Sequence, residues 1–368
     1  MGSNFVKRNA RPEIFNLKPY VPGKPIEEVE REMGISNVIK MASNENPLGP
    51  SPKALKRLEE MLPKLYLYPD GASYYLKTAV AAKLGLDPDG LVFGNGSDEL
   101  LRLLNETFIG PQEEIVFANP SFSEYEFMAT IMGGKCISVP LKDFRHDLSS
   151  MKDQVNDNTK MVYICNPNNP TGSIVTGQEI AEFMDDLPDD ILVVFDEAYV
   201  EYVDNPDFVS GLEYLNKGRN VIVLRTFSKI YGLAGLRVGY GITTKEIADA
   251  INSVREPFNV NLAAQEAARA AIEDDDHVKR SQELNLAGRA FLYKAFGEMG
   301  LKYVPTEANF IFVDIKQDCK KVFTEMLKLG VIIRTGDIFG HPTFIRVTIG
   351  TAEQNERFIN TLKKVLGA

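Results

Sequence analysis

The sequence contains few of the residues that bind metals or form disulfide bonds. Its three cysteines are widely spaced and give neither a disulfide framework nor a zinc pattern. Its three histidines also lack the spacing of a metal site, and they do not suggest a histidine-based catalytic triad. These residues are Cys136, Cys165, Cys319, His146, His277 and His341. The sequence therefore predicts no metal ion, and Cys165, which ends an apolar run, is interpreted as a structural thiol.

Long apolar runs and an excess of basic residues are also missing. No run of about 18 apolar residues is present that could cross a membrane as a helix. The formal net charge is −10, and no basic stripe suggests a nucleic-acid partner. The first residues lack the apolar core of a signal peptide. We therefore expect a cytoplasmic protein that binds neither membranes nor nucleic acid.

The composition is typical of a globular protein with one large domain or two. The chain has 368 residues, of which 44 % are hydrophobic and 25 % are charged. Apolar runs typical of buried strands end near Cys165, Phe195 and Arg225, and helical patterns lie between them. This alternation predicts an α/β fold with a mainly parallel, doubly wound sheet.

A lysine follows one of these strands. Lys229 comes shortly after the apolar residues 221–224, and ligands collect at strand ends in open α/β sheets. The hydroxyls of Thr226 and Ser228 and the guanidinium of Arg237 suit a bound phosphate. An amine beside a phosphate site suggests a Schiff-base lysine that holds a phosphorylated aldehyde cofactor. The alternative is a surface lysine in a polar loop.

Polar groups follow two further strands. Asp196 could pair with a protonated pyridine nitrogen, and Tyr199 and Asn169 could reach the hydroxyl of the same ring. Alone, Asp196 could be a helix cap and residues 166–172 a plain turn. Three polar clusters, each at the end of a buried strand, favour a shared site.

Residues 94–99 end a short strand and open a helix. Gly96 allows a tight turn, and the free N–H groups of Ser97 and Asp98 could bind phosphate. A dinucleotide fingerprint is rejected because Glu99 stands where its third glycine would be. A plain helix cap by Ser97 remains an alternative, partly compatible with phosphate binding.

The order of these motifs resembles the fold-type I pyridoxal-phosphate aminotransferases. The chain has Asn-Pro-x-Asn-Pro-Thr-Gly at 166–172, Asp-x-Ala-Tyr at 196–199, and Ser-Lys at 228–229 with an arginine eight residues on. Within this family it is most similar to the branch that acts on histidinol phosphate, through residues 17–23, 44–47, 68–70, 96–99 and 346–351. The resemblance implies an N-terminal arm with part of the small domain at 1–45, a large cofactor-binding domain at 46–285 and a small α/β domain at 286–368. Because Pro12, Pro19, Pro22 and Pro25 crowd the residues up to about 25, we expect this stretch to be extended, with a helix following at 26–33.

The resemblance also implies roles for residues outside the strand ends. Phe122 would stack on the cofactor ring, and Tyr68 would reach the cofactor phosphate of the other subunit in a homodimer. Tyr20 and the loop with Asn46 would contact the substrate. Each of the three aromatic residues has an alternative role. Phe122 could belong to the core, Tyr68 could pack in an interface without touching the cofactor, and Tyr20 could anchor the arm.

Two arginines complete the expected site. Arg346 lies in an apolar strand pattern, where an unpaired charge is costly, so it should meet an anion. By resemblance, Arg346 and Arg334 would grip the phosphate of the substrate, because histidinol phosphate has no α-carboxylate. A structural salt bridge is the alternative for each.

The resemblance implies transamination of histidinol phosphate with 2-oxoglutarate, giving imidazole-acetol phosphate and glutamate in histidine biosynthesis. Lys229, Asp196 and Tyr199 would be the catalytic residues, with pyridoxal 5′-phosphate as cofactor. One alternative is an aromatic amino-acid aminotransferase. A decarboxylase is disfavoured because Arg346 would hold the carboxylate that must leave. A non-catalytic cofactor-binding regulator is disfavoured because the chain has no room for a DNA-binding module.

Overall fold

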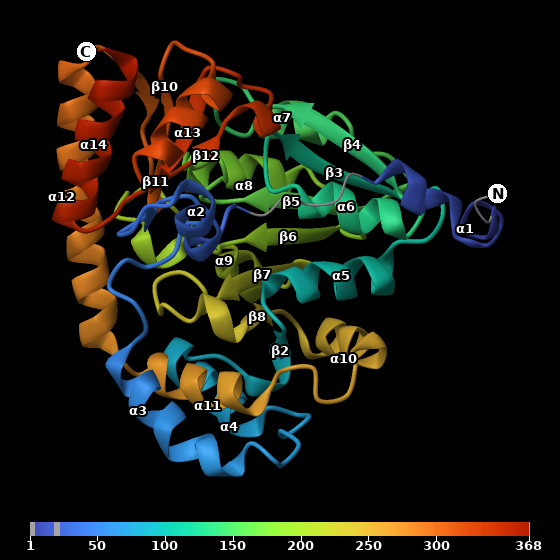
Figure 1. The fold of residues 1–368 in the computed structure, drawn as a ribbon. Helices are drawn as coiled ribbons and strands as arrows, with labels where there is room; N and C mark the ends of the chain where they lie inside the picture. The colour runs from blue at the N-terminus through green and yellow to red at the C-terminus, as the bar shows by residue number, and fades with distance from the viewer. Residues whose placement is uncertain (1–3, 18–22, 368) are drawn as a thin grey trace.

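The computed structural model describes residues 4–17 and 23–367. Its largest sheet has seven strands in the order β2-β8-β7-β6-β5-β3-β4 (Figure 1). The strands β7, β6, β5, β3 and β4 run parallel, and β8 is antiparallel to both of its neighbours. Their bounds are β2 Leu91–Gly94, β3 Glu114–Asn119, β4 Lys135–Pro140, β5 Thr159–Cys165, β6 Leu192–Asp196, β7 Val221–Thr226 and β8 Gly239–Ile242. The predicted α/β fold with a mainly parallel sheet is confirmed.

Helices cover both faces of this sheet, which explains why its central strands are apolar along their whole length. One face packs on α5 (Ser97–Phe108), α6 (Glu124–Ile131) and α10 (Lys245–Val254). The other packs on α4 (Tyr74–Leu84), α7 (Leu148–Lys152), α8 (Gly177–Asp185), α9 (Leu212–Asn216) and α11 (Leu262–Ala271), with α3 (Pro52–Met61) against α11. Figure 1 shows the sheet between these layers.

A second sheet lies beside the first and has its own apolar core. Its four antiparallel strands follow the order β12-β13-β10-β9. They are β9 Lys302–Val304, β10 Phe310–Asp314, β12 Arg334–Thr335 and β13 Phe344–Thr348, covered by α12 (Asp275–Glu298), α13 (Cys319–Lys328) and α14 (Ala352–Leu366). A parallel pair, β1 (Ile39–Lys40) and β11 (Val331–Ile332), joins the chain before the large sheet to this part.

The expected boundary at residue 285 lies inside α12, which runs without a break from the large sheet to the small one (Figure 1). Asp274 caps this helix by accepting a hydrogen bond from the N–H of His277, as expected for the start of a helix at the acidic run 273–276. The division into an arm, a large domain and a small domain stays a prediction.

The expectation of an extended N-terminal arm is wrong for part of it. Within residues up to about 25 the structure has α1 (Phe5–Asn9) and a 3-10 helix at Pro12–Asn16, whereas α2 (Ile26–Met33) is the helix expected to follow them. Pro12 takes the first helical position, where its missing N–H costs nothing, so proline there opens a helix rather than breaking one. Tyr20 lies outside the described residues.

The remaining short helices are 3-10 turns at Leu62–Lys64, Pro88–Gly90, Val200–Tyr202, Ala234–Leu236 and Asp337–Phe339. Within residues 4–17 and 23–367, no helix is both long enough and apolar enough to cross a membrane.

Candidate active site

A cavity of about 350 Å³ lies at the carboxyl ends of β5, β6 and β7. The carboxyl ends of parallel strands meet at one edge of a sheet, so side chains that follow separate strands come together there. The cavity is lined by eleven of the predicted residues: Ser97, Asp98, Phe122, Asn169, Asp196, Tyr199, Thr226, Ser228, Lys229, Arg237 and Arg346. The structure therefore brings the predicted polar clusters into one site.

Lys229 places its amine inside this cavity. Its Nζ lies 3.4 Å from the carbonyl oxygen of Ser43 and 5.5 Å from the centre of the Tyr199 ring. Burial, helped by the positive charge of Arg346, lowers the pKa of Lys229 to about 8. A buried amine with a lowered pKa is available in its neutral, nucleophilic form near neutral pH.

Asp196, at the end of β6, is a buried carboxylate at the wall of the same cavity, with 4 % of its surface exposed. Its Oδ2 accepts a hydrogen bond of 2.6 Å from the hydroxyl of Tyr125, and its Oδ1 accepts one of 3.2 Å from the N–H of Ala198. Burial raises the pKa of Asp196 to about 6, although both hydrogen bonds oppose this rise. Asp196 is therefore mostly ionised at pH 7 and can pair with a cation.

Tyr199 and Asn169 contact two different partners. The hydroxyl of Tyr199 accepts a hydrogen bond of 2.9 Å from Nδ2 of Asn44. Burial raises the pKa of Tyr199, so its phenol stays protonated and can donate into the cavity. The Oδ1 of Asn169 accepts a hydrogen bond from a guanidinium nitrogen of Arg346, which ties the loop at 166–172 to the small sheet.

The amino terminus of α5 and the guanidinium of Arg237 lie together at one side of the cavity and give it a positive potential. Gly96 is the N-cap of α5, so the alternative of a cap by Ser97 is wrong, and the first N–H groups of the helix point away from its body. Arg237 donates a hydrogen bond of 3.0 Å to Oδ2 of Asp98. A Cβ on Gly96 would lie 2.5 Å from Nη2 of Arg237, and one on Gly239 would lie 2.5 Å from the N–H nitrogen of Ser97. This close packing leaves backbone donors and a guanidinium side by side, which suits a phosphate.

Arg346 is buried and crosses from the small sheet into the cavity. It donates a hydrogen bond of 2.7 Å to the carbonyl oxygen of Ala42, and its guanidinium lies 5.3 Å from the centre of the Phe310 ring. Arg334 on β12 is the direct partner of Arg346 in the antiparallel register, so both side chains lie on one face of the sheet. Arg334 itself is not among the cavity-lining residues.

Two other predicted residues lie outside the cavity. The buried side chain of Asn46 donates hydrogen bonds to the carbonyl oxygen of Ile230 and to Oγ of Ser281, at 2.6 and 2.8 Å. It thus anchors the backbone beside Lys229 to α12, and substrate contact by Asn46 stays a prediction without support from this geometry. Tyr68 is 82 % exposed and stacks on Phe258, with ring centres 5.0 Å apart.

Sequence reasoning missed six residues at the site. Five more residues line the cavity: Ser43, Asn44, Glu124, Cys165 and Ala198. Tyr125 lies behind the cavity wall and contacts Asp196. Asn44 is two residues before the predicted Asn46, and no pattern in the loop distinguishes the two. Tyr125 stands only three residues after the predicted Phe122, in the first turn of α6, and this closeness in sequence was a usable signal.

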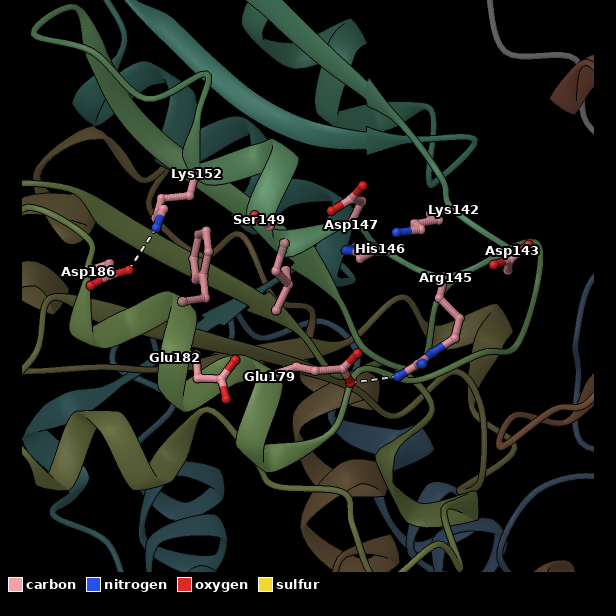
Figure 2. A pocket seen from close by; sticks show the side chains of 12 residues that line it. Lys142, Asp143, Arg145, His146, Asp147, Ser149, Lys152, Glu179, Glu182 and Asp186 are labelled. Carbon is pink, nitrogen blue, oxygen red and sulfur yellow. Dashed lines mark hydrogen bonds and ion pairs between the residues drawn. The ribbon is translucent and has the colours of Figure 1, made fainter.

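A second cavity of about 430 Å³ lies between α7 and α8 (Figure 2). Four of its charged side chains form two ion pairs: Arg145 lies 2.6 Å from Glu179, and Lys152 lies 2.7 Å from Asp186. Figure 2 shows both pairs across the hollow. None of the predicted site residues lines it, so the cavity at the strand ends is the candidate active site.

Comparisons with known proteins agree with this geometry. The family model described as aminotransferase class I and II matches residues 36–362. A histidinol-phosphate aminotransferase of Moorella thermoacetica is 58 % identical over 97 % of this chain and 92 % of that protein. One of Caldicellulosiruptor saccharolyticus is 48 % identical over 97 % of this chain and 99 % of that protein.

Solved structures show the same fold. The histidinol-phosphate aminotransferase of Sinorhizobium meliloti, solved in complex with pyridoxal-5′-phosphate, superposes with a TM-score of 0.90 at 28 % identity, covering 98 % of each chain. The chain belongs to the aminotransferases of classes I and II, and within them to the histidinol-phosphate aminotransferases.

Proposed function

We propose that the protein transfers the amino group of histidinol phosphate to 2-oxoglutarate, forming imidazole-acetol phosphate and glutamate for histidine biosynthesis. The observation that carries this proposal is the single cavity that holds the amine of Lys229, the carboxylate of Asp196 and the guanidinium of Arg346. Relatives up to 58 % identical are named for this activity. They favour it over an aromatic amino-acid aminotransferase on the same fold.

The residues of the cavity fit pyridoxal 5′-phosphate. Arg237 and the N–H groups at the start of α5 suit its phosphate, as do the hydroxyls of Thr226 and Ser228. Asp196 suits its ring nitrogen, and Phe122 lines the cavity where an aromatic ring can stack. When bound, this cofactor withdraws electrons from the substrate bond that loses its proton.

Residues of the chain transfer the proton and bind the substrate phosphate. Lys229 Nζ would accept the proton from Cα of the substrate, since its lowered pKa keeps much of the amine neutral near pH 8. Tyr199 would donate a hydrogen bond from its protonated phenol. Arg346, aided by Arg334 from the neighbouring strand, would hold the substrate phosphate in the forked geometry of a guanidinium.

A half-reaction tests the proposed chemistry. Cofactor-loaded protein is mixed with histidinol phosphate in the absence of 2-oxoglutarate, and the organic products are counted. We expect at most one imidazole-acetol phosphate per Lys229, and glutamate only after 2-oxoglutarate is added. Continuous product formation without an acceptor, or no product at all, would each contradict the proposal.

Gly96→Ala is expected to weaken binding of pyridoxal phosphate about ten-fold or more, measured by fluorescence titration. Gly96 has φ = 79°, and a Cβ there would collide with the guanidinium of Arg237. The matched control is Gly85→Ala, because Gly85 has φ = 68° but no atom within 4 Å of its added Cβ. Gly85→Ala should cost about 1 kcal/mol of stability and leave cofactor binding unchanged. Equal cofactor affinities in the two variants would contradict the proposed phosphate site.

We further propose a homodimer in which Tyr68 of the partner subunit completes each site. Tyr68 does not reach the cavity of its own subunit, and its ring is exposed. Exposed apolar and aromatic side chains surround it on residues 62–75, as is typical of a protein interface. These are Leu62, Leu65, Tyr66, Leu67, Tyr74 and Tyr75.

A subunit-mixing experiment tests the shared site. Lys229→Ala and Tyr68→Ala proteins, each of low activity, are unfolded together at equal amounts and refolded. In a mixed dimer one site has both native residues and the other has neither, so random pairing restores about a quarter of the wild-type activity. The control is each variant refolded alone. If the mixture is no more active than its components, Tyr68 acts within its own subunit or plays no part in the site.

A cytoplasmic location also belongs to this proposal. Cys136, Cys165 and Cys319 are all unpaired thiols. This state fits a reducing compartment, where disulfide bonds are rare.

A further inference from the structure

The carboxylate of Asp196 is held by a side chain that does not line the cavity. Tyr125 is buried, with 1 % of its surface exposed, and its hydroxyl lies 2.6 Å from Oδ2 of Asp196. The other carboxylate oxygen accepts from the N–H of Ala198, so the two donors fix the plane of the carboxylate. Because burial raises the pKa of Tyr125, its phenol remains a hydrogen-bond donor at neutral pH.

Aromatic packing fixes Tyr125 in turn. Its ring stacks on Tyr163 of β5, with centres 4.6 Å apart and planes 18° apart. It also meets Phe122 edge to face, with centres 5.8 Å apart and planes 85° apart. Tyr163 is held by a hydrogen bond of 2.9 Å from Nδ2 of Asn105 on α5. Phe122 stands just before α6 and Tyr125 in its first turn, and the N–H of Tyr125 donates a hydrogen bond of 3.4 Å to the carbonyl oxygen of Phe122.

We propose that Tyr125 is a positioning residue: its hydroxyl orients the Asp196 carboxylate toward the ring nitrogen of the cofactor, while its ring supports Phe122 against the face of the same ring. This inference rests on the proposed cofactor but on no particular substrate. The short segment from Phe122 to Tyr125, where the chain enters α6, would thereby position both the edge and the face of the cofactor ring.

The hydrogen bond also favours the ionised form of Asp196, since the phenol can only donate to it. The other titratable groups that face Asp196 are Lys229, Asp98, Cys165, Tyr163 and Tyr199. Lys229 favours the ionised form, and Asp98 opposes it. Removal of the phenol oxygen would leave Oδ2 without its donor in a buried place, and Asp196 would take up a proton at higher pH.

The test measures the dissociation constant of pyridoxal phosphate for the full chain between pH 6 and pH 8. Tyr125→Phe should bind the cofactor more weakly than the wild type, and the ratio of the two constants should grow toward about ten-fold as the pH falls. The matched control is Tyr163→Phe, which removes a buried hydroxyl from the same aromatic stack without touching Asp196. Its cofactor affinity should follow the wild type at every pH.

A double-mutant cycle with Asp196→Asn gives a second criterion. If Tyr125 acts through Asp196, the double variant binds the cofactor as weakly as Asp196→Asn alone. Additive losses, a loss that does not depend on pH, or an equal loss in Tyr163→Phe would show that Tyr125 only packs the core and would overturn the inference. The readout involves no substrate, so failure of histidinol phosphate to react would leave it intact.

Discussion

Lys229→Ala is expected to lower kcat for transamination by at least about 10⁴-fold, because the variant loses both the covalent anchor of the cofactor and the proposed proton acceptor. Lys229 is the lysine that lines the cavity, and its pKa is lowered to about 8 by burial. The rate is measured with saturating histidinol phosphate and 2-oxoglutarate. In parallel, borohydride reduction of the cofactor-treated wild type should place a covalent label on the peptide that contains Lys229.

Lys77→Ala is the matched control for this substitution. Burial also lowers the pKa of Lys77, but its side chain lies in a separate hollow beside Phe93 and Arg255. We expect this variant to keep its kcat and its labelled peptide. The proposed role of Lys229 would be contradicted if Lys229→Ala retained more than about a hundredth of the wild-type rate. A covalent label on another lysine would contradict it as well.

Arg346→Ala is expected to lower kcat/KM for histidinol phosphate by about 10²- to 10⁴-fold, mainly through KM. The substitution removes the forked partner of the substrate anion and breaks the contacts of Arg346 with Asn169 and Ala42. Arg346→Lys keeps the positive charge but loses the fork, so its kcat/KM should fall between those of the wild type and the alanine variant. Steady-state kinetics at several substrate concentrations separate the two constants.

Arg225→Lys serves as the control for removing a buried guanidinium. Arg225 pairs with Glu197 at 2.8 Å outside the cavity, so this variant should lose stability while KM stays unchanged. An unchanged KM for histidinol phosphate in Arg346→Ala would contradict the proposal that Arg346 binds the substrate anion. A rise in KM for both arginine variants would instead point to a general loosening of the fold.

Much of the site followed from the sequence because of one physical regularity. Strand ends in a parallel sheet meet at one edge, so Asn169, Asp196 and Lys229 could be placed together although they lie up to 60 residues apart. The helix start at Ser97 was also predictable, since Gly96 precedes an apolar helical pattern.

The direction of side chains within the loops could not be predicted, because it depends on the local backbone conformation. Asn44 has φ = 57°, a left-handed conformation that directs its side chain to Tyr199, while the side chain of Asn46 bends back to Ile230. Propensities do not distinguish two asparagines in one loop. The 3-10 helix at Pro12–Asn16 was missed because proline was interpreted as a helix breaker, although it also opens helices.

The central claim is best tested by comparing kcat/KM for histidinol phosphate with the values for phenylalanine and tyrosine, using 2-oxoglutarate as the common acceptor. If Arg346 and Arg334 bind a phosphate, histidinol phosphate should be preferred by at least about 10²-fold. The aromatic amino acids have no phosphate, and their carboxylate is attached directly to Cα, so it extends less far toward the two arginines. Comparable values for the three substrates would contradict the account and indicate an aminotransferase of broad aromatic specificity.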